Sequence, residues 1–486
     1  MLIATAESRA TTQPQTLLWL SACYALFMWT FSTLVASMTL YLTTLPHIQT
    51  TQAYTYYAIF ASLLWILPVV GGALSEKCGY FQSAIVGLLL CLSSLLFVCH
   101  PNLTSVFIGL SLFLIGNSFF TPAVWCLVDH LYHKTDSRRE AGFTLFYLLF
   151  NVGAVGGIFI SSYIRIRFNY AIEFSSCAFI LGLALAALLY SRSQYSVAEG
   201  RSIALQVNLS SAAIYNSLAL GSLIATPCVF ILFNHPNINT ALVYSAAIMS
   251  LGYLIQLAHK QPSKKQCQQV YGFIVLCIFA LGFWTLYNLE PSLVSVFIEK
   301  NVNKTLLGFH FSADAFFGFE ATFIVIVGLL LTRLWSYLGR KNKDISLAIK
   351  FGLALLIIGA GFIYLNMIIQ LNGMNQRLPA SLIILSYLFF ATGELFIGPL
   401  GISMVGKLAP LGKEGSLMGV WQLILGVGAI VSGWLAKQSV VPKHASFQQS
   451  QSRYAHLFNE FGLVIIFCGL LVLAVSPWVK KLLNDR

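Results

Sequence analysis

Long runs of apolar residues, separated by short polar segments, dominate the pattern along this chain. Each run has about 18 to 31 residues, enough for an α-helix rising 1.5 Å per residue to cross a bilayer. We count about fourteen such runs. They cover residues 16–43, 53–74, 82–99, 103–128, 141–163, 170–190, 208–233, 239–258, 268–298, 313–336, 346–371, 378–405, 415–437 and 461–480. The pattern predicts an all-α protein that crosses a membrane many times.

Composition supports a membrane protein, because 58% of the 486 residues are hydrophobic and only 9% are charged. A soluble chain of this length needs more charge than 28 basic and 16 acidic side chains to cover its surface. Most of the basic residues lie in polar segments on the side of the N-terminus. This bias predicts that both termini are cytoplasmic, and it accounts for the net charge of +12 without a nucleic-acid partner.

The polar segments and cysteines carry no sign of a cofactor, a metal or covalent chemistry. Residues 1–15 are polar and have no apolar core before a cleavage site, so we expect no removable signal peptide. The ten cysteines form no C-x-x-C pair, which favours packing over a metal site or a disulfide framework. A nucleophile elbow and a phosphate-binding loop are both missing, and the glycines of 426–433 are interpreted as helix-packing positions. An enzyme or an ATP-driven pump is therefore disfavoured.

Three glutamates, Glu290, Glu320 and Glu394, lie inside apolar runs of the C-terminal half, whereas lysine and arginine stay out of the middle of every run. A charged side chain in the bilayer costs about 2.5 to 3.5 kcal/mol on insertion scales. Such a residue normally faces a watery cavity, a partner or a transported ligand. The alternative is a protonated acid hydrogen-bonded between helices.

Ordered blocks of sequence resemble a known family of transporters. One block contains Pro68, two glycines and the pair Glu76-Lys77, and another runs from Phe146 through Asn151 to Ala154. Further blocks lie at 116–122, 138–143, 283–284, 393–403 and 407–421. Together they resemble the proton-dependent oligopeptide transporter (POT/PTR) family of the major facilitator superfamily.

This resemblance implies a fold of two six-helix bundles with an extra helical pair between them. We accordingly expect a cytoplasmic tail at 1–15, an N-terminal bundle at 16–190, a linker with two helices at 191–266 and a C-terminal bundle at 267–486. It also implies alternating access to a site near the membrane midplane, in a protein that works as a monomer in the inner membrane.

The first run departs from the family pattern. The family carries a Glu-x-x-Glu-Arg motif and a further arginine there, central to proton coupling, whereas this chain has Tyr24, Phe27, Met28 and Val35 at those positions. A family lysine is replaced by Thr121, and a family acid by Asn288. The usual cationic partner of a proton-exchanging carboxylate is therefore missing.

The acids of the C-terminal half are the principal candidates for the site. Glu394 keeps the family position that meets the amino group of a peptide, and Glu320 replaces a family asparagine as a second cation contact or a proton carrier. Glu290 follows Asn288 by two residues, which turns it about 200° on an ideal helix toward lipid or a neighbouring helix, unless Pro291 kinks the helix. The proton-coupling candidates are Glu320, Glu394 and Glu290.

Other candidates for the substrate site are polar or aromatic residues near matched positions, with packing between helices as the alternative for each. The full set of substrate-binding candidates is Glu394, Glu320, Asn151, Trp65, Asn288, Tyr287 and Tyr24. A second set lies at cytoplasmic helix ends and is interpreted as gate or interbundle charges: Glu76, Lys77, Asp129, Arg138 and Arg139.

Three functional hypotheses follow. The first is a secondary transporter that moves short peptides or peptide-like solutes with a proton, as a symporter. The second is a transporter of the same fold for an amine-bearing or neutral metabolite, a siderophore or a drug, because a cavity with acids only favours cations. The third is a substrate sensor or an inert paralogue that kept the fold and lost its coupling charges.

Overall fold

A computed structural model describes residues 14–132, 138–198, 211–341, 345–410, 413–440 and 445–483. Within these ranges fourteen helices or helical runs are long and apolar enough to cross a membrane, as the sequence pattern predicted, and the chain is a multi-pass membrane protein. The predicted tail at 1–15 lies almost wholly outside the described residues. The helices are α1 (Gln15–Thr44), α2 (Thr50–Cys78), α3 (Tyr80–Val98), α4 (Leu103–Asp129), α5 (Arg139–Arg167), α6 (Tyr170–Ala198), α7 (Ser211–Asn234), α8 (Pro236–His259), α9 (Lys264–Tyr287), α10 (Ser295–Asn301), α11 (Phe317–Arg340), α12 (Leu347–Leu371), α13 (Ala380–Leu408), α14 (Glu414–Lys437) and α15 (Phe447–Leu483).

Short elements complete the fold. A wide turn, η2 (Glu290–Val294), joins α9 to α10, and a 3₁₀ turn, η3 (Asp314–Phe316), precedes α11. Four strands of two residues each lie in the connections: β1 (Val302–Asn303) pairs with β4 (Leu378–Pro379) in parallel, and β2 (Thr305–Leu306) pairs with β3 (Phe309–His310) in antiparallel fashion. These pairings involve only loop segments, so the architecture stays helical.

The last helix shows where hydropathy misplaces a helix end. The apolar run predicted 461–480, but α15 begins at Phe447 and ends at Leu483. The added N-terminal residues are polar, and Arg453 donates to the backbone oxygen of Gln438 at 2.8 Å. Hydropathy reports the part of a helix that lies in hydrocarbon, whereas backbone hydrogen bonding continues beyond it.

The described chain divides into two compact units. Of the described residues, unit 1 comprises those within 14–35 and 67–234, and unit 2 comprises those within 36–66 and 235–483, so α1 and α2 each contribute to both. Of the two helices in the predicted linker, α7 packs against α3 and α4 in unit 1, and α8 packs against α9 and α14 in unit 2. The domain boundaries at 190 and 266 remain a prediction.

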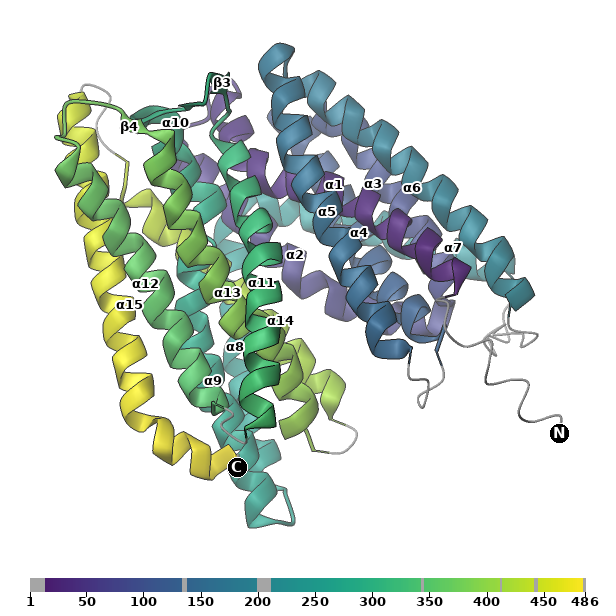
Figure 1. The fold of residues 1–486 in the computed structure, drawn as a ribbon. Helices are drawn as coiled ribbons and strands as arrows, with labels where there is room; N and C mark the ends of the chain where they lie inside the picture. The colour runs from purple at the N-terminus through teal and green to yellow at the C-terminus, as the bar shows by residue number, and fades with distance from the viewer. Residues whose placement is uncertain are drawn as a thin grey trace. The chain divides into compact units, whose positions relative to one another are not determined.

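Small residues set the spacing of the helices in unit 1, where α3 lies along α4 and α5 against α1 (Figure 1). A Cβ added to Gly116 of α4 would lie 2.6 Å from the backbone oxygen of Gly87 on α3. A Cβ added to Gly153 of α5 would lie 2.0 Å from the backbone oxygen of Ala25 on α1. Glycine is required at these positions because helix backbones in a membrane gain van der Waals contact by approaching closely.

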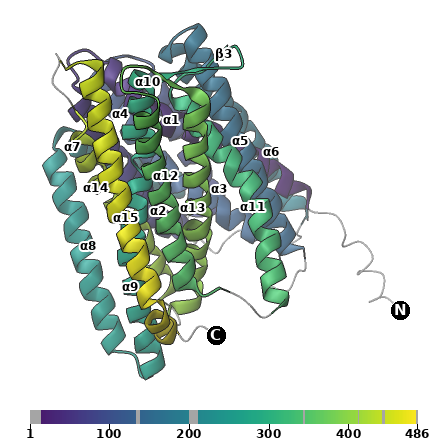
Figure 2. The same ribbon diagram turned by 60° about the vertical axis from the view of Figure 1, so that its left-hand side comes forward.

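The same device holds α12 to α15 in unit 2, where the two helices run side by side (Figure 2). Gly359 and Gly462 face each other across this contact, and a Cβ on either would lie 2.9 to 3.1 Å from the backbone oxygen of the other. The glycines of α14 act similarly, since Gly433 lies against Ala58 of α2 and Gly428 against Trp284 of α9. This confirms their interpretation as packing positions.

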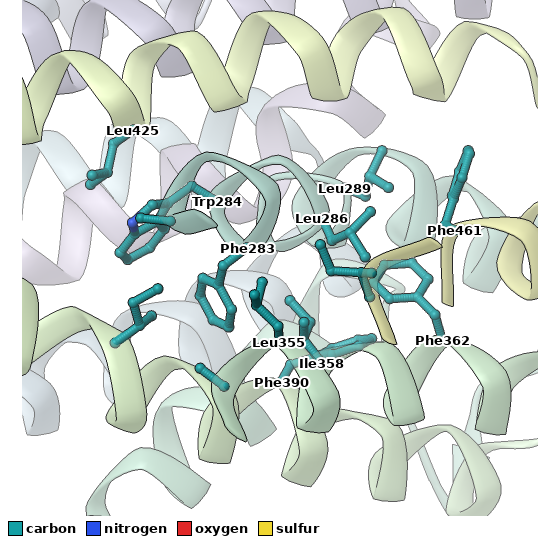
Figure 3. Packing of buried hydrophobic residues seen from close by; sticks show 14 of the residues in the cluster. Phe283, Trp284, Leu286, Leu289, Leu355, Ile358, Phe362, Phe390, Leu425 and Phe461 are labelled. Atoms are coloured by element: carbon teal, nitrogen blue, oxygen red, sulfur yellow. The ribbon is translucent and has the colours of Figure 1, made fainter. Parts of the chain in front are cut away.

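A continuous apolar core fills unit 2 and fixes α9 among α12, α13, α14 and α15 (Figure 3). Phe283 and Leu286 of α9 are almost fully buried, as are Leu355 and Phe362 of α12. This packing holds one face of α9 rigidly. Its C-terminal end therefore presents Tyr287 and the following wide turn in defined positions.

Candidate functional site

The wide turn η2 begins at Glu290, after the two residues Asn288 and Leu289 that follow the end of α9. Pro291 has no backbone N–H, so the regular hydrogen-bond ladder cannot continue through it. The N–H of Val294 instead donates to the oxygen of Leu289 at 2.9 Å, and the N–H of Ser295 donates to that of Glu290, each five residues back. Five-residue spacing defines a π-helical turn, a feature found often at functional sites.

The turn begins at Glu290 itself. An ideal helix would turn Glu290 away from Asn288, toward lipid or a neighbouring helix. Its side chain is 1% exposed and interacts electrostatically with Glu320 and Glu394, so it faces the neighbouring helices α11 and α13 and not lipid. The kink that Pro291 was expected to introduce takes the form of this turn.

Three carboxyl groups from separate elements meet inside unit 2. Glu290 comes from η2, Glu320 from the first turn of α11 and Glu394 from the middle of α13. Glu290 and Glu320 are 1% exposed, and Glu394 is partly buried. Glu320 interacts electrostatically with both other glutamates. We call these three residues the carboxylate cluster.

Tyrosines surround the carboxylate cluster on several elements. The hydroxyl of Tyr287 on α9 donates to Oε2 of Glu394 at 3.1 Å. Tyr57 of α2 and Tyr387 of α13 lie within electrostatic range of Glu290 and Glu320. The hydroxyl of Tyr387 is buried and has no hydrogen-bond partner among the described residues, and the same holds for Nε1 of Trp284. The cluster therefore combines acceptors with buried donors.

Among the described residues, no basic side chain balances the carboxylate cluster. None of the three carboxylates pairs with a lysine, arginine or histidine in these ranges, and no three acidic, histidine or cysteine side chains there are placed so that they could hold a metal ion. Negative charge in apolar surroundings attracts cations more strongly than it does in water. The chemistry available to this cluster is therefore the binding of an ammonium group or of protons.

The amide nitrogen of Asn288, the residue that follows α9, does not bind the carboxylate cluster. Asn288 is 6% exposed, and Nδ2 donates to the backbone oxygen of Trp284 at 2.8 Å. Trp65 of α2 is partly buried and packs against the apolar core of unit 2. Each residue thus has a packing or capping role in the described contacts.

Aromatic packing occupies the part of unit 1 where the related family carries charge. Tyr24 is 5% exposed, and its hydroxyl accepts a hydrogen bond of 3.1 Å from Nε1 of Trp125. Its ring lies 5.0 Å from that of Phe146. Phe27 is fully buried against Phe120, with ring centroids 4.4 Å apart. We call these five residues the aromatic cluster.

Two nearby polar side chains, Thr121 at a substituted position and Asn151 in a matched block, form hydrogen bonds within their own helices. Thr121, which stands where the family carries a lysine, donates to Oδ1 of Asn117 at 2.7 Å. Asn151 is 5% exposed and donates from Nδ2 to the backbone oxygen of Tyr147 at 2.8 Å, within its own helix. Both contacts serve helix structure.

The predicted gate charges lie at helix ends of unit 1. Glu76 and Lys77 are exposed in the last turn of α2, and Asp129 ends α4. Glu76 and Asp129 both act electrostatically on Cys126, so the C-terminal ends of α2 and α4 lie close to each other. Arg138 is partly buried just before α5, and the side chain of Arg139 lies outside the described residues.

Sequence reasoning missed two residues of the site, Tyr57 and Tyr387. Both lie in apolar runs at positions that resemble ordinary packing aromatics, and no spacing distinguishes them. The detectable signal was a hydroxyl in a membrane span, which needs a polar partner when it is buried. The sequence did not reveal that this partner would be the carboxylate cluster.

Comparison with known proteins agrees with this description. The sequence profile of the POT family matches residues 80–453. Dipeptide and tripeptide permease B of Edwardsiella piscicida is 27% identical over 440 residues, which cover 89% of this chain and 88% of the relative. The di-/tripeptide transporter of Lactococcus lactis subsp. cremoris is 25% identical over 448 residues, with coverage of 89% and 88%.

Solved structures show the same fold. A crystal structure of peptide transporter POT in complex with sulfate matches with a TM-score of 0.83 at 21% identity, over 97% of this chain and 96% of that one. A structure of tetrameric PepTSo2 matches with a TM-score of 0.82 at 20% identity, over 96% and 98%. The likeness confirms the predicted all-α membrane fold.

Proposed function

The chain belongs to the POT family, and from that premise we propose that it carries short peptides across the bacterial inner membrane together with protons. Support comes from bacterial relatives that are named as dipeptide and tripeptide permeases and align along most of the chain. The mechanism is alternating access, in which binding and reorientation replace covalent chemistry. We further propose that a monomer suffices and that both termini face the cytoplasm.

The hydrogen bond between Tyr287 and Glu394 carries the proposal at the level of residues. The phenol donates to Oε2 and thereby orients the carboxylate. One turn further along α13, a Cβ added to Gly398 would lie 3.7 to 3.9 Å from the Glu394 side chain, so glycine leaves this flank uncovered. An oriented, partly buried carboxylate with an uncovered flank suits the ammonium group of a peptide, through a charge-assisted hydrogen bond.

The variant Glu394→Gln tests this assignment because it keeps the shape and removes the charge. We expect counterflow of labelled dialanine in proteoliposomes to fall at least about tenfold, equivalent to about 1.4 kcal/mol. The matched control is Glu460→Gln on α15, whose carboxylate is 53% exposed and lies 3.4 Å from Nδ1 of His456. Counterflow at the wild-type level in Glu394→Gln would remove this residue from the substrate site.

The described part of the site offers no basic side chain to pair with the carboxylate of a peptide, which predicts weak recognition of that end. In the described part of unit 1, Tyr24, Phe27 and Thr121 occupy positions where the family carries charge, and all three have local contacts. We therefore expect the amide of dialanine to compete with labelled dialanine within about threefold of free dialanine, because no strong ion pair is lost.

This competition also separates peptide transport from the second candidate substrate class. If simple primary amines compete as well as dialanine does, the protein carries amine-bearing metabolites. If free dialanine competes more than tenfold better than its amide, a basic side chain that is not among the contacts described above binds the carboxylate of the peptide. Complete absence of dialanine counterflow in the wild-type protein would refute the proposed function itself.

A further inference from the structure

Glu290 and Glu320 form a pair that is chemically distinct from Glu394. Glu394 accepts from the Tyr287 hydroxyl, which also lies within reach of Glu320. Glu290 and Glu320 lie within hydrogen-bonding reach of each other, but both oxygens of Glu290 and Oε1 of Glu320 have no donor group in the described chain. Both side chains are 1% exposed, compared with the partly buried Glu394. A buried acceptor without a partner is costly, typically about 1 to 3 kcal/mol, and more when it is charged.

A second observation points to the same place. The hydroxyl of Tyr387 is fully buried, has no partner in the described chain and interacts electrostatically with Glu290, Glu320 and Asp314. Tyr57 approaches Glu290 and Glu320 from α2. A buried hydroxyl can donate to a neighbouring carboxylate when that group is charged, and it can accept from the same group when it is protonated. Such an arrangement suits a site that binds and releases a proton.

We propose that the Glu290–Glu320 pair is the coupling-proton site of this transporter, located in unit 2 and not at the usual motif of the first helix. The inference rests on the proposed function and adds where the proton binds. Two carboxylates in contact cannot both hold a negative charge without strong repulsion, and a proton shared between them relieves it. The position of the usual motif, in contrast, is filled by the aromatic cluster.

The transfer is a simple exchange with water. A proton from the acidic side forms an O–H bond with one carboxylate of the pair, and after reorientation that bond breaks and the proton returns to water on the other side. The titratable groups around the pair are Tyr57 on α2, Tyr287 on α9, Tyr387 and Glu394 on α13, and Asp314 on η3.

Coupling to the peptide follows from the interaction of the pair with Glu394, which acts electrostatically on both of its members. Without cations the cluster carries up to three negative charges in apolar surroundings. An ammonium group at Glu394 and a proton on the pair each reduce this charge. Since charge in a low-dielectric interior opposes reorientation, the protein moves most readily when both sites are filled.

Two transport assays on Glu290→Gln and Glu320→Gln test the inference. Counterflow exchanges labelled for unlabelled dialanine and needs no net movement of protons, whereas accumulation under an inward acid gradient requires it. We expect each variant to lower the ratio of gradient-driven accumulation to counterflow at least tenfold relative to the wild type. Glu394→Gln, in contrast, should lose both, and the exposed control Glu460→Gln should lose neither.

The outcomes separate the inference from the proposed function. Wild-type accumulation in both glutamine variants would overturn the inference, and so would loss of counterflow with an unchanged melting temperature, which would make the pair part of the peptide site. If a glutamine variant fails to fold, Glu320→Ala and Tyr387→Phe go through the same assays, with Glu320→Asp as the variant that keeps a carboxylate. A wild-type level of accumulation in both Glu320→Ala and Tyr387→Phe would also overturn it.

Discussion

Tyr24 and Tyr287 show how far the surroundings decide what one residue type does. Both lie in membrane-spanning helices, and both were predicted to line the substrate site. The hydroxyl of Tyr287 donates to the carboxylate of Glu394, whereas that of Tyr24 accepts from Trp125 inside the aromatic cluster. The first contact leads to a charged group that can bind a ligand, and the second joins two packed rings.

The variant Tyr24→Phe is therefore expected to affect stability and not transport. It leaves Nε1 of the partly buried Trp125 without its acceptor, at a cost of about 1 kcal/mol. We expect a melting temperature lower by a few degrees and dialanine counterflow within about twofold of the wild type. Tyr244→Phe on α8, at a ring that is 38% exposed, is the matched control. A tenfold loss of counterflow with an unchanged melting temperature would instead place Tyr24 in the substrate site.

At the scale of elements, the contact of α5 with α1 depends on glycines one helical turn apart. Gly153 and Gly157 lie against the backbone of α1, and a Cβ on Gly157 would lie 2.4 Å from the oxygen of Trp29. Ser32 donates to the oxygen of Ala154 at 3.1 Å, which is possible only at this close approach. The motif that resembled the transporter family at 146–154 thus serves helix packing in this structure.

Gly157→Val should force α5 away from α1. Overpacking costs about 1 to 3 kcal/mol, so we expect the melting temperature of the purified protein to fall by roughly 3 to 10 °C. Gly182→Ala on α6 is the control, because nothing lies within 4 Å of an added Cβ there. An unchanged melting temperature in Gly157→Val would show that α5 and α1 can move apart without a loss of stability.

At the scale of the whole molecule, the two units carry unlike chemistry. Unit 2 contains the carboxylate cluster and its tyrosines, whereas unit 1 contains the aromatic cluster at the positions that carry charge in the related family. Lys350, near the start of α12, is a buried basic residue. Its ammonium lies 4.5 Å from the centre of the Trp335 ring. A cation near a helix end with an aromatic partner is tolerated at the membrane boundary.

The distribution of basic residues predicts that both termini face the cytoplasm. A fluorescent protein fused after Arg486 should therefore fluoresce in bacterial cells, and alkaline phosphatase fused at the same position should be inactive. The converse fusions after Gly373, in the connection between α12 and α13, should show phosphatase activity. The opposite pattern at either position would reverse the proposed orientation.

The sequence by itself determined that this protein is a helical membrane protein with fourteen spans, since apolar length is a direct consequence of bilayer thickness. It also predicted the three acids inside apolar runs as candidates for one functional site, because charge in hydrocarbon is costly. Only the tertiary structure decided that Glu290 joins Glu320 and Glu394, that Tyr57 and Tyr387 approach them, and that Tyr24 is packed. These facts depend on a π-helical turn and on contacts between residues far apart in the chain, and neither follows from the periodicity of one helix.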